Sequence, residues 1–299
     1  MMADFLVLCL ARFNLALSAA ILLVLVMRPL VRRLLGPELA YLLWVLPPVA
    51  AVTSLFPTLG DFISVSTIVP RAMHISPDRY LSSDRSPMLL DLYAAGAVGL
   101  LTLFLLCERR FRRLAARGLV GPAVVGLSWP RMVVPADYET RFTAPERRLI
   151  RQHEQTHVVR GDPHANLVIA GVQAIAWFNP LVHLASRSVR LDQELACDAA
   201  VIERNPESRR LYGETLVKAQ STGVWSAFAC ALTDGTRHPL EVRLAFLRRP
   251  PLSVRQYVAG ATLVGAVALM TALCVWALAP ETMGAGQTPM VQAMFSPDG

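Results

Sequence analysis

Charged residues are scarce in this sequence, and its cysteines show no pairing pattern. Only 17% of the 299 residues are charged, whereas 54% are hydrophobic, and the mean hydropathy is +0.43. An ordinary soluble domain carries far more charge, so this composition predicts a protein of the lipid bilayer. The five cysteines form no C-x-x-C pair and are odd in number, which argues against a disulfide framework.

Acidic residues are too few to balance the basic ones, which leaves a net charge of +7. Such a balance also occurs in proteins that bind nucleic acid. Here, however, the arginines cluster beside apolar runs, where they usually record the orientation of a membrane protein. We therefore expect no direct contact with nucleic acid.

Four apolar segments are long enough to form membrane-spanning helices, each of which needs about 20 residues. They cover residues 5–27, 39–56, 89–107 and 257–278. Positive charges follow the first segment instead of preceding it, so we interpret it as an uncleaved anchor and not as a signal peptide. Arg12 lies inside this anchor, where a charge hints at a function, although its side chain can also extend to the membrane interface.

Three arginine clusters flank these segments and predict the topology. They lie at residues 28–33, 109–113 and 248–255. Because arginine clusters mark cytoplasmic loops, all three place the same regions in the cytoplasm. We therefore predict three membrane helices over residues 1–107 with a polar extracytoplasmic loop near 58–87. A cytoplasmic domain over 108–256, a fourth membrane helix over 257–278 and a short extracytoplasmic tail over 279–299 follow.

The predicted cytoplasmic domain begins with a β-hairpin over residues 123–134 and continues with helices. Two short β-branched runs flank a Ser-Trp-Pro turn there. Asp162-Pro163 and Asn179-Pro180 each pair an N-cap residue with proline in the first turn, so each begins a helix. Residues 166–178 are apolar nearly all round but short for a membrane span, so we expect a buried helix or one at the membrane surface.

A metal-binding motif lies on the best-defined helix of this domain. Thr143-Ala-Pro-Glu146 matches a capping box and Gly161 supplies the stop, which predicts a helix from about Ala144 to Arg160. Within it, His153-Glu154-Gln-Thr-His157 is the zincin motif H-E-x-x-H. Residues four apart share one face of a helix, so both imidazoles can bind one Zn²⁺ while Glu154 acts on a water molecule beside it.

A catalytic zinc site needs a third protein ligand. The extended motif that ends in a third histidine fails here, because Arg160 and Pro163 stand where glycine and histidine are required. His164 is one residue too late, so we expect it at the surface or hydrogen-bonded to a ligand. A carboxylate from a later helix is the better candidate.

Glu194 and Asp198 lie one turn apart on the helix expected from Pro180 to about Glu203. We predict that Glu194 binds the zinc ion and that Asp198 hydrogen-bonds the free nitrogen of a ligating histidine, which fixes its orientation. The alternative is a ladder of ion pairs with neighbouring arginines such as Arg190 on a solvated face.

Several motifs together resemble the antirepressor membrane metalloproteases of bacteria, which include the transducer parts of β-lactam sensor and methicillin-resistance regulator proteins. The motifs are HEQTHVVRGD at residues 153–162, WFNPL at 177–181, DQELACD at 192–198, Tyr212-Gly213 and the segment that begins at Arg243. The resemblance covers most of residues 40–280. It implies a gluzincin fold in the bacterial cytoplasmic membrane with the active site on the cytoplasmic side. It assigns His153, His157 and Glu194 as zinc ligands and Glu154 as the catalytic carboxylate.

The resemblance also implies a regulatory function. In such proteins an outside signal activates the cytoplasmic protease, which cleaves itself and brings about the loss of a winged-helix transcriptional repressor. The predicted hairpin offers an edge strand on which an extended substrate can pair, and the loop from Ser221 to His238 is our hypothetical self-cleavage site. Only about twenty residues follow Leu278, without a Ser-x-x-Lys motif. We therefore do not expect this chain to sense a β-lactam through a penicillin-binding domain.

Two other functions stay open. One is a housekeeping protease that degrades damaged membrane proteins, and the other is a non-enzymatic signalling protein with a structural zinc site. Structural sites are usually closed by four ligands, often thiolates, so the retained glutamate of H-E-x-x-H favours an enzyme. Tyr212, His183 and Arg187 are candidate donors to the transition-state oxyanion. The fold class that we predict is mainly α, with about four membrane helices and a zinc protease domain that carries a small hairpin.

Overall fold

The computed structural model describes residues 2–56, 86–126, 129–220, 239–249 and 252–278. These residues are mainly helical, as predicted. One antiparallel hairpin pairs β1 (Ala123–Val125) with β2 (Arg131–Val133), and Val124 lies opposite Met132. The hairpin therefore forms within the range that the β-branched runs predict.

Four helical segments of the described chain are long and apolar enough to cross a membrane. They are α1 (Met2–Leu34), the run from α2 (Gly36–Leu42) through η1 (Leu43–Val45) to α3 (Leu46–Thr53), α5 (Ser86–Ala116) and α12 (Val254–Leu278). They coincide with the four apolar segments of the sequence. The chain turns sharply between α1 and α2 at Gly36, whose φ of +81° favours glycine.

The remaining helices lie toward one end of the molecule, from which two of them extend back between the candidate spans. These remaining helices are α6 (Tyr138–Arg141), α7 (Ala144–Arg160), α8 (Asp162–Ile175), α9 (Pro180–Arg204), α10 (Arg209–Gln220) and α11 (Pro239–Leu247). The bounds of α7 agree with those predicted from its caps, and Gly161 ends it with a left-handed φ of 73°. Asn179 caps α9 by accepting a hydrogen bond from the Leu181 N–H at 3.0 Å.

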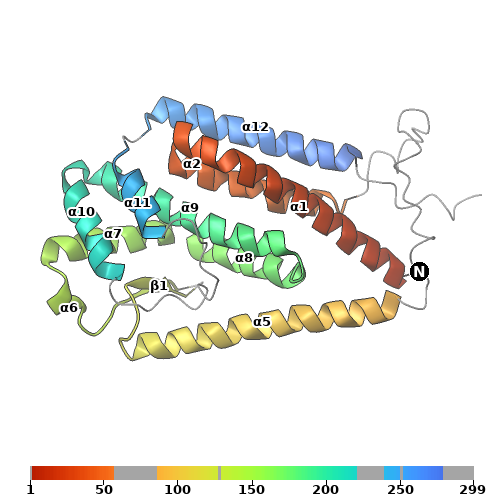
Figure 1. Ribbon diagram of the computed structural model, residues 1–299, viewed down its shortest axis with the longest axis horizontal. Helices are drawn as coiled ribbons and strands as arrows, with labels where there is room; N and C mark the ends of the chain where they lie inside the picture. The colour runs from red at the N-terminus through yellow and green to blue at the C-terminus, as the bar shows by residue number, and fades with distance from the viewer. Residues whose placement is uncertain (1, 57–85, 127–128, 221–238, 250–251, 279–299) are drawn as a thin grey trace, which may run out of the picture.

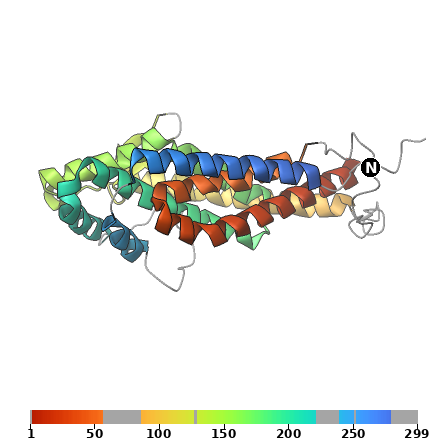
Figure 2. The same ribbon diagram turned by 90° about the horizontal axis from the view of Figure 1, so that it is seen from above.

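The arrangement of the helices places α9 at the centre. Figure 1 shows α1, α2 and α12 on one side, α5 on the other, and α8 and α9 between them. In Figure 2 the N-terminus and the end of α12 lie at the end of the molecule opposite α7, α10 and α11. The middle of α9 is buried, with Leu195, Ala196 and Cys197 at most 1% exposed. A side chain on this part of α9 therefore meets several other helices.

A buried ionic cluster joins α9 to the first two candidate spans. Asp192 on α9 is fully buried and accepts a hydrogen bond from the Trp44 Nε1–H at 2.8 Å. Its carboxylate oxygens also lie 3.6 Å from Arg28 Nη1 and 3.5 Å from Arg32 Nε. Buried charges are tolerated when they are paired, so this cluster fixes α9 against the end of α1.

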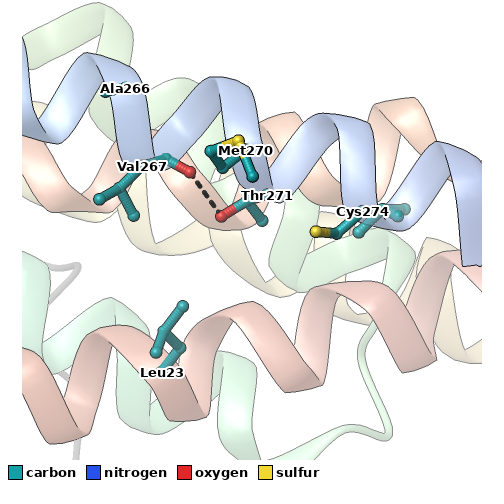
Figure 3. Close-up of a pocket in the computed structure, with 7 residues that line it drawn as sticks. Leu23, Ala266, Val267, Met270, Thr271 and Cys274 are labelled. Carbon is teal, nitrogen blue, oxygen red and sulfur yellow. Dashed lines mark hydrogen bonds between the residues drawn. The ribbon is translucent and has the colours of Figure 1, made fainter.

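The helices α1 and α12 leave an apolar hollow between them. The hollow has a volume of about 410 Å³. Figure 3 shows Leu23 of α1 facing Val267, Met270 and Cys274 of α12 across it. The Thr271 hydroxyl donates to the carbonyl oxygen of Val267 at 2.8 Å. An apolar surface whose few polar groups bond within their own helix is typical of a hydrocarbon environment.

The start of α7 provides a test of its local stability. The Glu146 carboxylate accepts hydrogen bonds from the Thr143 backbone N–H at 2.6 Å and from Lys218 Nζ at 2.9 Å. Burial alone would raise the pKa of Glu146, but these donors hold it below its usual range.

We expect Glu146→Gln to lower the free energy of unfolding by on the order of 1 kcal/mol at pH 7. Because the folded-state pKa of this carboxyl is depressed, its contribution is present above the unfolded-state pKa and lost as the pH falls. The difference between wild type and variant should therefore shrink below about pH 4. Thermal unfolding of the detergent-solubilised protein at several pH values measures it, and a difference that grows in acid would contradict the assignment.

Candidate metal centre

Three side chains that the sequence predicts as ligands converge where α7 passes α9. His153 and His157 lie on one face of α7, and their Nε2 atoms are 3.2 Å apart. Glu194 on α9 faces both, with Oε2 3.4 Å from His153 Nε2 and Oε1 3.6 Å from His157 Nε2. These three residues form a group that could hold a metal ion.

The spacing of these atoms can be compared with the geometry of zinc. Zinc binds nitrogen and oxygen at about 2.0–2.2 Å in a tetrahedron, which places two ligand atoms about 3.4 Å from each other. The two imidazole nitrogens, 3.2 Å apart, lie close to that value, and each has one oxygen of the Glu194 carboxylate 3.4 or 3.6 Å away. The donor set therefore fits a zinc ion with one coordination position left open.

Glu154 lies beside this group on α7 and is only 8% exposed. Burial raises the pKa of its carboxyl group above the ordinary value, and the imidazoles of His153 and His157 offset this only in part. A carboxylate with a raised pKa is a better proton acceptor near neutral pH. Glu154 is therefore suited to act as a base next to the three candidate ligands.

The imidazole of His157 is oriented by a residue of α8. Its Nδ1 lies 2.7 Å from Asp162 Oδ2, and Asp162 is 1% exposed. The Tyr41 hydroxyl donates to the other oxygen of Asp162 at 2.9 Å. A carboxylate on Nδ1 keeps the proton there and leaves Nε2 free for a metal. The sequence predicted Asp162 as the N-cap of this helix, which is wrong, because Gly161 is the cap and Asp162 is the first residue of α8.

The imidazole of His153 is oriented by one residue of α10 and one residue of α9. Its Nδ1 is 2.8 Å from the Tyr212 hydroxyl and 3.4 Å from Asp198 Oδ1. Tyr212 in turn donates to Asp198 at 2.7 Å, so the imidazole N–H is assigned as the donor to the tyrosine oxygen. Asp198 therefore lies on the side of His153 where the sequence predicted it, with the tyrosine hydroxyl closer to the ring.

The candidate oxyanion donors lie in different places. Tyr212 is 1% exposed and contacts Nδ1 of His153, the ring edge that points away from Glu194. His183 contacts the carbonyl oxygen of Trp177 at 2.8 Å, at the corner between α8 and α9. Neither residue is therefore placed to contact a substrate at the metal group. Arg187, two turns before Glu194 on α9, stays a candidate.

A buried guanidinium that the sequence analysis did not single out completes the site. Arg243 of α11 lies 2.9 Å from Glu194 Oε2 and donates two hydrogen bonds to Asp198, at 2.7 and 2.8 Å. This cation therefore reaches Glu194 from a helix other than α9, whereas the alternative considered above relied on arginines of α9 itself. The only signal of Arg243 in the sequence was its presence in the segment that carries the family resemblance.

The charges of the site favour a bound cation. Burial would lower the pKa of His153, but hydrogen bonds and charges from Asp198 and Glu194 raise it to about 10. Burial would likewise raise the pKa of Glu194, but Arg243 and the two imidazoles hold it well below its usual range. The shift of His153 reflects the two carboxylates around its ring, and the shift of Glu194 keeps that side chain a carboxylate, which is the form that binds a divalent ion.

A second group of possible ligands shares His157 through its Nδ1 atom and includes Asp162 and Cys197. The 2.7 Å between His157 and Asp162 is a hydrogen-bond length and shorter than two ligands of one metal normally show. Burial raises the pKa of the Cys197 thiol far above its ordinary value, which disfavours the thiolate that metals bind. We interpret this group as the orienting shell of His157.

The chain was compared with known proteins. Residues 8–86 and 108–247 match the family described as BlaR1 peptidase M56. The regulatory protein BlaR1 of Bacillus licheniformis is 33% identical over 129 residues, which make up 41% of this chain. The match spans only 21% of that relative's length. No solved structure matches the chain.

Proposed function

Because this chain belongs to the BlaR1 peptidase M56 family, whose match covers more than half of it, we propose that it is a zinc-dependent endopeptidase of a regulatory membrane system. The family is one of metallopeptidases, and its relative is a regulatory protein. The observation that carries the proposal is the convergence of His153, His157 and Glu194 at separations of 3.2–3.6 Å beside the buried Glu154.

In this proposal His153, His157 and Glu194 hold the zinc ion. Bound zinc would supply a Lewis acid that polarises the scissile carbonyl and lowers the pKa of water. Glu154 accepts the proton of the attacking water and passes it to the leaving amine. Asp162 and Tyr212 keep the protons of the two imidazoles on Nδ1, so that each Nε2 faces Glu194.

The substrate that we propose is a protein, specifically a winged-helix repressor or the chain itself. The β1–β2 hairpin contacts α7 and offers an edge strand on which an extended segment can pair. The hypothetical self-cleavage loop from Ser221 to His238 lies outside the described residues. The arginine clusters support a location in the bacterial cytoplasmic membrane, with the protease domain of residues 108–256 on the cytoplasmic side.

The metal content of the purified chain tests this site. We expect wild-type protein to contain zinc at about one ion per chain, and His157→Ala to lose it because two ligands bind zinc far more weakly than three. His164→Ala is the matched control, since His164 is exposed two turns further along the chain. Elemental analysis of protein extracted in mild detergent measures the ratio. Wild-type protein without zinc, or equal zinc in His157→Ala, would refute the proposed centre.

A further inference from the structure

The corner between α8 and α9 contacts two candidate membrane spans. The Trp177 Nε1–H donates to the carbonyl oxygen of Tyr93 on α5 at 3.1 Å. Its indole packs against α5 at Gly96, where a Cβ atom would lie only 2.2 Å from the ring. On the other side, the Asn179 side chain donates to the Ser18 hydroxyl of α1 at 2.8 Å. The corner is therefore held between α1 and α5.

The positions of these contacts along α1 and α5 give their depth. Ser18 precedes the first cytoplasmic arginine, Arg28, by about ten residues, which is about 15 Å of helix. Gly96 precedes Glu108, where the charged end of α5 begins, by about twelve residues or about 18 Å. The hydrocarbon layer of a bilayer is about 30 Å thick. Both distances place the corner near the middle of that layer.

From this corner, α8 and the first part of α9 both lead back to the depth of Arg28 and Arg32. We call these two helical segments the arms of the corner. The 14 residues of α8 span about 21 Å and begin at Asp162, next to His157. The segment of α9 from Pro180 to Glu194 has about the same length. Asp192 then forms its ion pairs with Arg28 and Arg32 at the end of α1. Two helices thus run inward from the level of the metal group and back again, as Figure 1 shows between α1 and α5.

The exposed side chains of these arms are apolar apart from His164, which lies at the start of α8 near the level of the metal group. Large apolar side chains of α8 and of the corner are 45–57% exposed, namely Leu167, Val168, Ile175 and Phe178. Near the corner, His183 contacts Gln173 at 3.1 Å and the carbonyl oxygen of Trp177 at 2.8 Å, whereas Asn166 Oδ1, near the start of α8, has no hydrogen-bond partner among the described residues. Hydrocarbon requires the combination found near the corner, because polar groups there must find partners within the protein.

We propose that α8 and the first half of α9, about residues 163–189, form a re-entrant hairpin whose exposed apolar face contacts lipid acyl chains at the middle of the bilayer. The proposal rests on the proposed topology of the four spans. It changes the domain prediction, because part of the segment 108–256 then lies inside the membrane. It also places the metal group, at the base of the hairpin, at the boundary between lipid and cytoplasm.

Photolabelling of the full chain in phospholipid vesicles tests the hairpin. A carbene reagent confined to the hydrocarbon layer is activated in the reconstituted wild-type protein, and labelled residues are identified by peptide mass spectrometry. The matched positions have similar exposure: Phe178 at 53% and Val168 at 54% on the hairpin, Leu101 at 48% on α5, and Val217 at 49% on α10. We expect label at Phe178 and Val168 comparable to that at Leu101, and none at Val217.

Absence of label at Phe178 and Val168 beside a labelled Leu101 would overturn the hairpin while leaving the spans intact. Label at Val217 equal to that at Phe178 would also overturn it, because the reagent would then report apolar exposure alone. An unlabelled Leu101 would instead reject the proposed topology. As a second measurement, Val168→Asp should lower the yield of membrane-inserted protein strongly and Val217→Asp should not, since only the first charge would enter hydrocarbon. Equal yields would count against the proposal.

Discussion

Glu154→Gln is expected to abolish proteolysis while the protein keeps its zinc. The amide has the shape of the carboxyl group but cannot accept a proton, and removal of a general base typically costs a factor of about 10²–10⁴ in rate. The side chain lies beside the three candidate ligands without being one of them, so metal binding should persist. The readouts are N-terminal sequencing of fragments of the chain, the half-life of a co-expressed winged-helix repressor, and zinc content.

The matched control is Glu214→Gln, because Glu214 is exposed on α10 and pairs with its neighbour Arg210. It should leave fragments, repressor half-life and zinc unchanged. Identical fragments from wild type and Glu154→Gln would rule out self-cleavage. A repressor that disappears equally with both would remove the enzymatic role of Glu154 and favour a non-enzymatic signalling protein. Loss of zinc in Glu154→Gln would show that this carboxylate belongs to the metal-binding set.

The predictions that the structure confirms depended on local signals. The capping box at Thr143 and the stop at Gly161 are read within a few residues of each other, and they give the bounds of α7 correctly. The shared face of the two histidines on that helix follows from helical periodicity alone, because they are four residues apart. Apolar length likewise located the four candidate spans. In each case the information lies within one turn or one segment of the chain.

The parts that the sequence did not reveal are contacts between distant segments. Tyr41 reaches Asp162 across 121 positions of the chain, and Arg243 reaches Asp198 across 45. Local pattern contains no information about which cation meets which carboxylate. Tyr212 was therefore considered as an oxyanion donor, whereas the structure places its hydroxyl on the outer edge of His153. Contacts of this kind position the candidate ligands, but the residues that make them have no characteristic spacing in the sequence by which they could be identified.

The surroundings of residues 166–178 could likewise not be predicted from the sequence. A helix that is apolar on all sides can be buried in protein, lie at an interface or enter lipid, and periodicity does not separate these cases. The contacts of Trp177 with Tyr93 and of Asn179 with Ser18 decide its neighbours. In the proposed topology, the depth of the segment in the membrane follows from where those neighbours lie along their own helices.

Arg243→Ala is expected to be the most destabilising substitution at the site. Removing one partner of a buried ion pair typically costs about 3–5 kcal/mol, because the remaining charge stays buried without compensation. Asp198, whose side chain is 2% exposed, would lose its cation in this way, whereas Glu194, 36% exposed, would lose a partner that water can replace in part. Without its cation, Asp198 would also hold Tyr212 and His153 less firmly. Arg243→Lys keeps the charge but not the paired hydrogen bonds, so its loss of stability should be intermediate.

Thermal unfolding of the detergent-solubilised protein, with zinc and with a chelator, separates the effects of Arg243 on folding and on the metal. Added zinc should recover part of the stability of Arg243→Ala, because a divalent ion compensates Glu194 but does not reach Asp198. Arg248→Ala is the control, since Arg248 is exposed just after α11. If Arg243→Ala unfolds at the wild-type temperature, the guanidinium does not neutralise the two carboxylates. If zinc restores it fully, the pairing with Asp198 contributes nothing, and Arg243 serves only to balance Glu194 before the metal binds.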